Sequence, residues 1–316
     1  MEYSYDITCV GTALVDSIVR GFDPTPVSAS GFRAASGTLS VGGEAVNGAI
    51  AAAKLGLRVR ILCSLGRDDA GELVTAALQR NGVDTASIRY SEEHPTPVST
   101  LLVNSDGTRK SITNDAHRYN FHPERVPEAL GSTRILCLGS LFRAPFDDPA
   151  VIRGVLEAGR SGGALLFADT KLPNFRPLTL DAIRDSLPLI DYIFPNEDEA
   201  RHFSGKENPE EAADEFLRLG VRNVIVKLGS RGCLFKNSRE RYRLDAFAIN
   251  PVDATGAGDN FIAGFARELL NGGGHEQALR FANACGAICT TAIGASAALR
   301  DCGQVARFLE AQSTLD

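Results

Sequence analysis

Short apolar runs alternate with longer amphipathic stretches along most of the chain. The apolar runs lack polar alternation, which is typical of strands in a parallel sheet buried on both faces. We expect strands at 6–14, 59–65, 134–139, 164–169, 192–195 and 224–228. In the stretches between, apolar residues recur at helical spacing, which predicts helices over 44–56, 69–81, 149–161, 179–187 and 209–219. This alternation predicts an α/β fold with a doubly wound, mostly parallel sheet flanked by helices.

Two segments, 15–41 and 96–113, interrupt the alternation. Both have the mixed polarity of extended chain, and in the second the turn residues Asp106-Gly107 separate two β-rich runs, which indicates a hairpin. We expect the two segments to form a small β-sheet lid on a single domain spanning 1–316. Glycine-rich stop signals separate three further helices expected at 257–270, 275–291 and 303–311.

The composition argues against a nucleic-acid-binding protein or a membrane protein. Of 316 residues, 33 are Lys or Arg and 39 are Asp or Glu, so the net charge of −6 is opposite to that expected of a phosphate-backbone binder. No apolar run approaches the roughly 18 residues that span a bilayer, and the start lacks the basic region of a signal peptide. Seven scattered cysteines without a C-x-x-C pair suit a reducing compartment. We therefore expect a cytoplasmic protein.

The strongest chemical signal is the segment 253–259, Asp-Ala-Thr-Gly-Ala-Gly-Asp. Apolar residues at helical spacing follow it, so a helix is expected to begin near Ala257, with N–H groups that have no partner within the helix. Gly256 and Gly258 have no Cβ and let an anion approach these groups. Asp259 lies in the first turn, where it can accept a hydroxyl proton. A glycine turn with a helix-start carboxylate is the alternative, and the other acidic and hydroxyl groups of the segment favour the anion site.

Two common nucleotide-binding motifs do not fit the sequence. The dinucleotide fingerprint needs a third glycine where the late segment has Phe261, and it follows the first strand of its fold. A dehydrogenase is therefore disfavoured. A Walker A loop is excluded because the sole Gly-Lys pair, Gly205-Lys206, is followed by Glu207. Phosphate chemistry in this chain must use another design.

An early glycine pair, Gly42-Gly43, precedes the helix predicted at 44–56. The glycines let a ligand approach the start of that helix, and Asn47 offers a donor and an acceptor to hydroxyl groups. Taken alone, these residues are explained equally well by a packing turn with a capping function.

Together, the early and late motifs resemble the two signatures of the ribokinase-like (PfkB) family of sugar kinases. The resemblance covers nearly the whole chain in the same order and includes Asn196-Glu197-Asp198-Glu199 and the stretch 227–232. It implies a ribokinase-like α/β kinase that uses ATP and Mg²⁺ to phosphorylate a primary hydroxyl of a small unphosphorylated sugar. It also raises K⁺ as a further cation.

The resemblance implies roles for residues at the reacting groups. Asp259 is implied as the base that accepts the hydroxyl proton. The N–H groups of Gly256, Ala257 and Gly258 are implied as the anion hole for the transferred phosphoryl group. Sugar contacts are implied for Asp16, Gly42, Gly43 and Asn47.

The resemblance also implies sites for the nucleotide and for cations. Contacts with ATP are implied for Asn196, Lys227, Gly229, Gly232 and Asn283. Glu199 and Asn196 match the motif that orders magnesium through water, and the same two residues have capping-box spacing. A monovalent-cation loop is implied for Asp253, Thr255, Cys289, Ala292 and Gly294.

The chain departs from the family pattern at two places. The last position of the cation loop, often a serine in relatives, is Ala298, with Ser296 two residues earlier. The stretch 169–174 lacks the arginine that several sugar kinases carry. Lys171 or Arg143 could supply the missing positive charge to the phosphates, and a solvated loop lysine is the alternative for Lys171.

Glu44 in the early motif bears on the substrate, because relatives that act on phosphorylated sugars generally have a basic residue there. A carboxylate would repel a substrate phosphate, so we expect a ribose-like or fructose-like sugar first, nucleosides second and sugar acids third. Phe22 or Phe32 could still stack on a nucleobase. A nucleoside kinase and a non-catalytic sugar or nucleotide sensor stay as alternatives, although Asp259 argues against the sensor. An exposed lid edge favours a homodimer formed through the lid.

Overall fold

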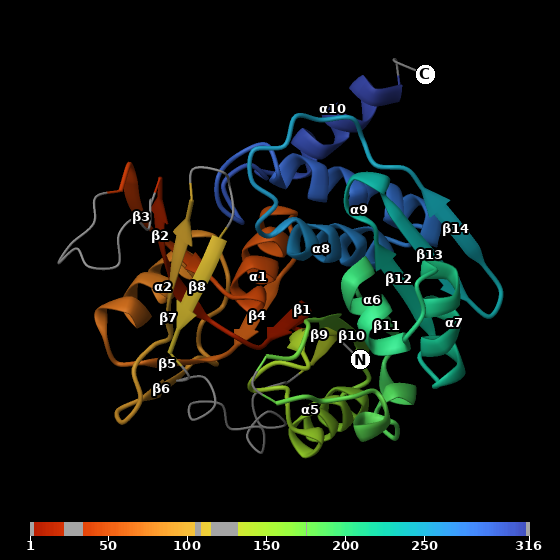
Figure 1. Cartoon of the computed structure of the whole chain (residues 1–316), viewed down its shortest axis with the longest axis horizontal. Coiled ribbons are helices and arrows are strands. Elements are labelled where there is room, and N and C mark those ends of the chain that lie inside the picture. The colour runs from red at the N-terminus through yellow and green to blue at the C-terminus, as the bar shows by residue number, and fades with distance from the viewer. Residues whose placement is uncertain (1–2, 22–33, 105–108, 115–131, 175, 314–316) are drawn as a thin grey trace.

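The computed structural model describes residues 3–21, 34–104, 109–114, 132–174 and 176–313. An eight-stranded main sheet has the strand order β14-β13-β12-β11-β10-β9-β1-β4 (Figure 1). The strands from β12 to β4 are parallel, and an antiparallel hairpin, β13-β14, extends one edge. The strands are β1 (Tyr5–Val10), β4 (Val59–Leu62), β9 (Thr133–Leu141), β10 (Leu165–Thr170), β11 (Tyr192–Phe194), β12 (Asn223–Lys227), β13 (Cys233–Asn237) and β14 (Arg241–Leu244).

Helices cover both faces of the main sheet, which confirms the predicted fold class. Because side chains alternate along a strand, neighbouring residues of β9 point into different cores. Ile135 belongs to the core formed with α1, α2, α8, α9 and α10, and Leu136 belongs to the core formed with α5, α6 and α7. Among the described helices, none is long and apolar enough to cross a membrane. The helices are α1 (Glu44–Lys54), α2 (Asp69–Arg80), α5 (Pro149–Ser161), α6 (Glu197–Ser204), α7 (Pro209–Arg218), α8 (Ala257–Leu270), α9 (His275–Cys289) and α10 (Cys302–Ser313).

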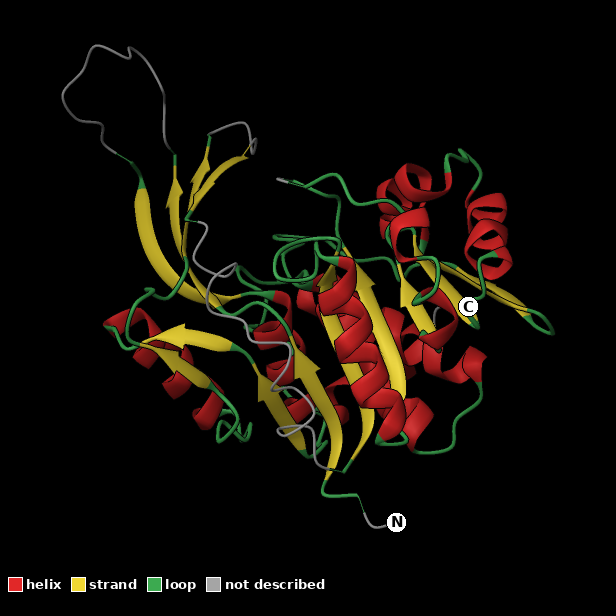
Figure 2. Ribbon diagram, turned by 90° about the horizontal axis from the view of Figure 1, so that it is seen from below, coloured by secondary structure: helices red, strands yellow, loops and turns green. Residues whose placement is uncertain are grey.

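The two interrupting segments form a separate four-stranded sheet, which we call the lid sheet. Its strands follow the order β3-β2-β7-β8, with a parallel β2-β7 pair between two antiparallel pairs. Figure 2 shows this sheet standing apart from the main sheet. The turn expected at Asp106-Gly107 lies outside the described residues. The strands are β2 (Leu14–Arg20), β3 (Ser36–Gly42), β7 (Val98–Val103) and β8 (Arg109–Thr113).

Some predicted elements are wrong or divided. The helix predicted over 179–187 is replaced by two 3₁₀ turns, Asp181–Ile183 and Leu187–Leu189. In this stretch the N–H groups of Ile183, Arg184 and Ser186 bond to carbonyl oxygens three residues earlier, which is the 3₁₀ and not the α pattern. The strand predicted over 59–65 is divided between β4 and β5 (Ser64–Gly66), which pairs with β6 (Arg89–Ser91).

Two further differences concern where elements end or begin. The strand predicted over 6–14 leaves the main sheet after Val10, and the chain enters the lid sheet at Leu14. Helix α6 was not predicted as an element, although the capping-box spacing of Asn196 and Glu199 marks its start.

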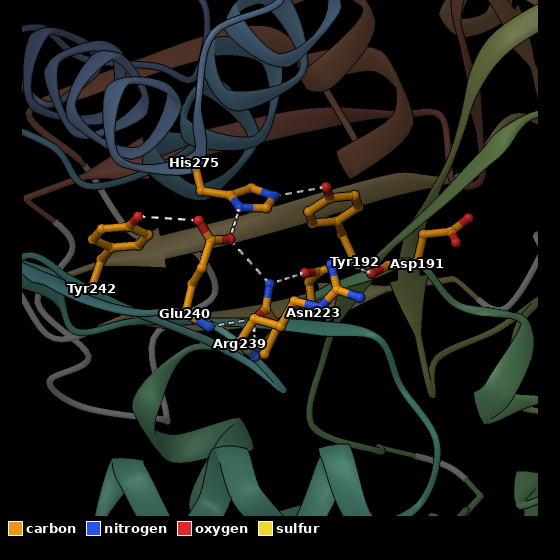
Figure 3. A network of polar contacts seen from close by, with 8 residues as sticks. Asp191, Tyr192, Asn223, Arg239, Glu240, Tyr242 and His275 are labelled. Carbon is orange, nitrogen blue, oxygen red and sulfur yellow. Dashed lines mark hydrogen bonds and ion pairs between the residues drawn. The ribbon is translucent and has the colours of Figure 1, made fainter.

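A polar network attaches the β13-β14 hairpin to α9 (Figure 3). His275, the first residue of α9, bonds through Nδ1 to Glu240 at 2.6 Å and through Nε2 to the Tyr192 hydroxyl at 3.0 Å. Its ring stacks on Phe235 with 4.4 Å between centroids. None of these four residues lines the large cavity described below. We therefore interpret this network as structural.

Candidate active site

A cavity of about 890 Å³ lies between the carboxyl ends of the main-sheet strands and the lid sheet. In open α/β sheets, ligands bind at this end of the strands. The main sheet contributes residues at or just beyond the ends of β9 to β12, namely Arg143, Asp169, Asn196 and Lys227. The lid sheet contributes Leu14, Asp16, Ser99, Leu101, Lys110, Ser111 and Thr113. The start of α1 and the segment 254–259 complete the wall.

Helix α8 begins at Ala257, as the late motif predicted, and we call the backbone of residues 256–258 at its start the cradle. Gly256 is the N-cap with φ of 77°, and a Cβ there would lie 2.4 Å from the Cβ of Ala295. Only glycine fits this position without strain. The Asn260 side chain donates to the carbonyl oxygens of Gly256 at 2.8 Å and Ala295 at 2.9 Å, so it holds the two loops together. A Cβ on Gly258 would lie 3.1 Å from Nζ of Lys227, which therefore approaches the helix start closely.

The Asp259 carboxylate lies on the wall of this cavity, in the first turn of α8. Its Oδ2 accepts a hydrogen bond from Nδ2 of Asn47 at 2.9 Å, so the early and late motifs meet in space. Burial, and then the Glu44 carboxylate, raise the pKa of Asp259 to about 7, against the opposing influence of the Lys171 ammonium. A base works best when its pKa lies near the operating pH. With a pKa of about 7, the Asp259 carboxyl can take up and release a proton near neutral pH.

The early glycines make room for two neighbouring groups. A Cβ on Gly42 would lie 2.2 Å from Oδ2 of Asp16, and a Cβ on Gly43 would lie 2.3 Å from the carbonyl oxygen of Thr12. Gly43 also has φ of 95°, which favours glycine. The pair thus lets the lid strand carrying Asp16 approach the start of α1 closely.

Two pairs of opposite charge line the cavity. Lys227 Nζ lies 2.6 Å from Oδ1 of Asp169, and Lys171 Nζ lies 3.3 Å from Oε1 of Glu44. The Glu44 carboxylate raises the pKa of Lys171, which is therefore a cation at neutral pH. Burial acts to raise the pKa of Glu44, but the Lys171 charge and the hydrogen bonds that the carboxylate accepts outweigh it and lower the pKa. Lys171 is thus held by a carboxylate instead of being a solvated loop lysine.

Asn196 and Glu199 form a complete capping box at the start of α6 and also line the cavity. Oε2 of the buried Glu199 accepts both the Asn196 N–H at 2.9 Å and the Thr170 hydroxyl at 2.8 Å. Burial raises the pKa of Glu199; Lys227 opposes the shift and the Asp169 carboxylate adds to it. The carboxylates of Glu199 and Asp169 outnumber the single Lys227 ammonium, so a further cation would be favoured beside them.

The remaining residues implied for ATP lie in two places. Gly229 lines the cavity beside Lys227. Gly232, with φ of 81°, packs against the end of β14. A Cβ there would lie 1.9 Å from the carbonyl oxygen of Leu244. Asn283 lies on α9 and donates to the carbonyl oxygen of Asp245 at 3.4 Å. Neither Gly232 nor Asn283 is among the lining residues of the cavity.

The residues implied for a monovalent cation converge around Asp253. Its Oδ1 accepts the N–H of Thr255 at 3.0 Å and the Thr255 hydroxyl at 2.7 Å. Its Oδ2 accepts the N–H of Gly294 at 3.1 Å. The Cys289 thiol donates to the carbonyl oxygen of Thr255 at 3.4 Å. Ala292 lies in the loop between Cys289 and Gly294.

Comparisons with known proteins decide the family. The family described as pfkB family carbohydrate kinase matches residues 6–302. The chain belongs to this family. It is a sugar kinase with the ribokinase fold.

Relatives of this pfkB kinase include both fructokinases and ribokinases. The "Probable fructokinase-3" of Arabidopsis thaliana is 29% identical over 289 residues, which is 86% of this chain and 83% of that protein. The ribokinase of Haemophilus influenzae is 27% identical and covers 86% of this chain and 88% of its own. The structure of Arabidopsis thaliana ribokinase complexed with ribose and ATP is 27% identical, covers 97% of this chain and 99% of its own, and has a TM-score of 0.82.

Sequence reasoning gave no role to Asp169, which lines the cavity and pairs with Lys227, or to Asn260 and Arg20, which hold the loops beside it. Asn260 was not singled out, although an amide between the glycine motif and the apolar run that begins at Phe261 was a usable signal. Arg20 contacts Asp253 at 3.5 Å from the last position of β2, and nothing in the local sequence indicated this pairing.

Proposed function

We propose that this pfkB kinase transfers the γ-phosphoryl group of ATP to a primary hydroxyl of an unphosphorylated ribose-like or fructose-like sugar. The observation that carries the proposal is the position of Asp259. It is hydrogen-bonded to Asn47, adjoins the N–H groups of the α8 start, and shares a cavity with Asp16 of the lid sheet. A sugar between Asp16 and Asp259 would present its hydroxyl to the carboxylate.

In this proposal each group has a distinct task. Asp259 accepts the proton of the attacking hydroxyl, and Asn47 holds the carboxylate in place. The N–H groups of 256–258 and the α8 dipole stabilise negative charge on the transferred group. Lys227 and Lys171 add positive charge along the phosphates, each kept in place by a carboxylate. Phosphoryl transfer depends mostly on such positioning and charge stabilisation.

Magnesium fits the negative region next to these groups. Asn196 and Glu199 would hold it through water, since Mg²⁺ prefers oxygen donors and loses its hydration reluctantly. Burial raises the pKa of Glu199 and the Asp169 carboxylate adds to the shift, against the opposing Lys227 charge, so a further cation there would favour the ionised carboxylate. When bound, the ion neutralises charge on the β- and γ-phosphates.

The lid side of the cavity supports a neutral acceptor. Apart from Asp16 and Lys110, its side chains are hydroxyl, amide or apolar groups, which match the hydroxyls of a sugar. From the sequence, Glu44 served as an argument against a substrate phosphate. In the structure, Glu44 lies on the Asp259 side of the cavity, and the positive charge of Lys171 balances it. The polarity of the lid is therefore the better support for a neutral sugar.

A nucleoside acceptor is the second candidate, and the lining residues disfavour it. None of the described lining residues is aromatic, so a nucleobase would find no stacking partner among them. Phe22 and Phe32 lie outside the described residues.

The first prediction concerns the acceptor. With ATP and Mg²⁺, we expect ribose or fructose to support ADP formation at least 10-fold faster than their phosphorylated forms or nucleosides, because the described lid residues that line the cavity include one cation, Lys110, and no aromatic ring. A coupled ADP assay with a panel of sugars, sugar phosphates, sugar acids and nucleosides measures this. A sugar phosphate that is turned over well while its parent sugar is not would contradict the proposal.

The second prediction is a homodimer formed through the lid sheet. Leu39 on β3 and Ile112 on β8 are 68% and 67% exposed. They share one row across the sheet with Ser17 and Thr100, whereas Asp16 lies in the alternate row that faces the cavity. The lid therefore has an outer face with exposed apolar side chains that a second copy would cover. Sedimentation at micromolar concentration is expected to show a dimer, and Leu39→Asp a monomer; a monomeric parent protein would contradict this prediction.

A further inference from the structure

Four donors from the described part of the chain reach the Asp253 carboxylate, and one of them belongs to a lid residue. Oδ1 receives the N–H and hydroxyl of Thr255, and Oδ2 receives the N–H of Gly294 and Nη2 of Arg20 at 3.5 Å. An ionised carboxylate has about four lone-pair sites. Protein donors therefore account for all of them, and an additional cation would have to displace one.

Other oxygens around this loop are also engaged. The carbonyl oxygen of Thr255 accepts the Cys289 thiol at 3.4 Å. The carbonyl oxygen of Ala295 accepts that thiol at 3.3 Å and the Asn260 amide at 2.9 Å. The position at which relatives often supply a serine oxygen is Ala298. The Asp253 carboxylate and the Thr255 carbonyl oxygen are therefore already engaged, and the serine oxygen is lost, so this loop fits a bound potassium ion poorly.

We propose that the guanidinium of Arg20 takes the place of a monovalent cation at Asp253. The side chain of Arg20 is 33% exposed and that of Asp253 is 12% exposed, so the pair is partly shielded from solvent. A guanidinium is charged at every working pH and donates in fixed directions. It therefore places a positive charge beside Asp253, next to the loop that leads into the cradle at Gly256.

Arg20 reaches Asp253 from a well-defined position in the lid sheet. It pairs with Ser36 of β3 and Val103 of β7, and its carbonyl oxygen accepts the N–H of Ala35 at 2.9 Å. Arg20 lies four residues after Asp16, so both side chains lie on the same face of β2.

The same strand thus carries a proposed sugar contact and the cation that holds the loop before the cradle. A soluble ion would stabilise that loop whatever the lid does. Arg20 ties the loop to the position of the lid, which makes it a positioning residue for phosphoryl transfer. This role rests on the proposed function only in taking 256–258 as the phosphate-binding backbone.

The first test measures stability, so it needs no substrate. Thermal unfolding is followed in potassium chloride and in tetramethylammonium chloride at equal ionic strength. We expect the parent protein to unfold at the same temperature in both salts. Arg20→Met is expected to unfold at a lower temperature, and potassium, in a concentration-dependent manner, should recover part of the loss by binding the vacated carboxylate. Arg58→Met, which removes an exposed partner of Asp6, is the matched control and should show no specific response to potassium.

The second test measures turnover with the best acceptor. We expect the parent protein to turn over at equal rates in the two salts. In tetramethylammonium, Arg20→Met is expected to have a kcat about 10-fold lower than that of the parent protein, and potassium or guanidinium should restore part of it. Arg20→Lys should retain most of the activity. A parent protein that potassium stabilises or activates several-fold overturns the proposal, as does an Arg20→Met variant without any potassium response. Because the unfolding test needs no acceptor, its result does not depend on whether the protein phosphorylates the proposed sugars.

Discussion

Asp259→Asn is expected to lower kcat by roughly 100-fold or more while ATP binding is retained. Asparagine keeps the size of the side chain and an oxygen that can accept the Asn47 hydrogen bond, but it cannot take up the hydroxyl proton. Steady-state kinetics with the best acceptor and direct titration with ATP separate the two effects. Near-normal turnover by the variant would refute the assignment of the base.

The pKa of Asp259 gives this prediction a pH signature. Because burial, followed by Glu44, raises the pKa to about 7, kcat/KM should fall as the pH drops below about 7, where the carboxylate becomes protonated. Protonated Asp259 favours the folded state at low pH, and that contribution is lost as the pH rises through about 7. Asp259→Asn should therefore unfold at an equal or higher temperature than the parent protein at pH above 7, which shows that lost activity is not lost folding.

Gly256→Ala is expected to reduce kcat by about 100-fold, comparable to the removal of an oxyanion-hole donor. The new Cβ would lie 2.4 Å from the Ala295 Cβ and 2.6 Å from its Cα, at a residue with φ of 77°. The loop before α8 must move to relieve this contact, and the N–H groups of the cradle would move with it. Steady-state kinetics and thermal unfolding measure the two consequences.

Gly272→Ala is the matched control for this substitution. Gly272 has φ of 83°, so alanine there suffers the same backbone strain, but no atom lies within 4 Å of its Cβ position. We expect this variant to lose some stability and to keep its kcat. If the two variants had the same kcat, the close packing of Gly256 against Ala295 would have no role in the reaction.

The sequence predicted the fold well because its main signals are local. Fully apolar runs followed by amphipathic stretches predicted β1, β9, β10, β11 and β12 within a doubly wound sheet, and the mixed polarity of 15–41 and 96–113 indicated the lid sheet. The helix expected over 179–187 was wrong, because apolar spacing alone does not distinguish short 3₁₀ turns from an α-helix.

Without the family resemblance, which implied most of the site residues, the site was predictable only as far as single residues reveal their chemistry. Gly256, Gly258 and Asp259 could be recognised because their conformational freedom and charge are properties of the residues themselves. Pairings could not be predicted, because the partners come from distant parts of the chain. Lys227 and Asp169 are 58 positions apart, and Arg20 and Asp253 are 233 apart. The topology of two sheets brings such groups together, and no local pattern encodes it.

The division of the cavity between two sheets has a consequence for engineering acceptor choice. The proposed phosphoryl-transfer groups lie on the main sheet and α8, whereas many of the groups that would surround the acceptor lie on β2, β7 and β8. These strands belong to two continuous insertions, so grafting both from another member of the family should exchange acceptor preference as a unit. The loop before α8 would have to be grafted with its matching lid, because the Arg20 contact joins the two parts across the graft boundary.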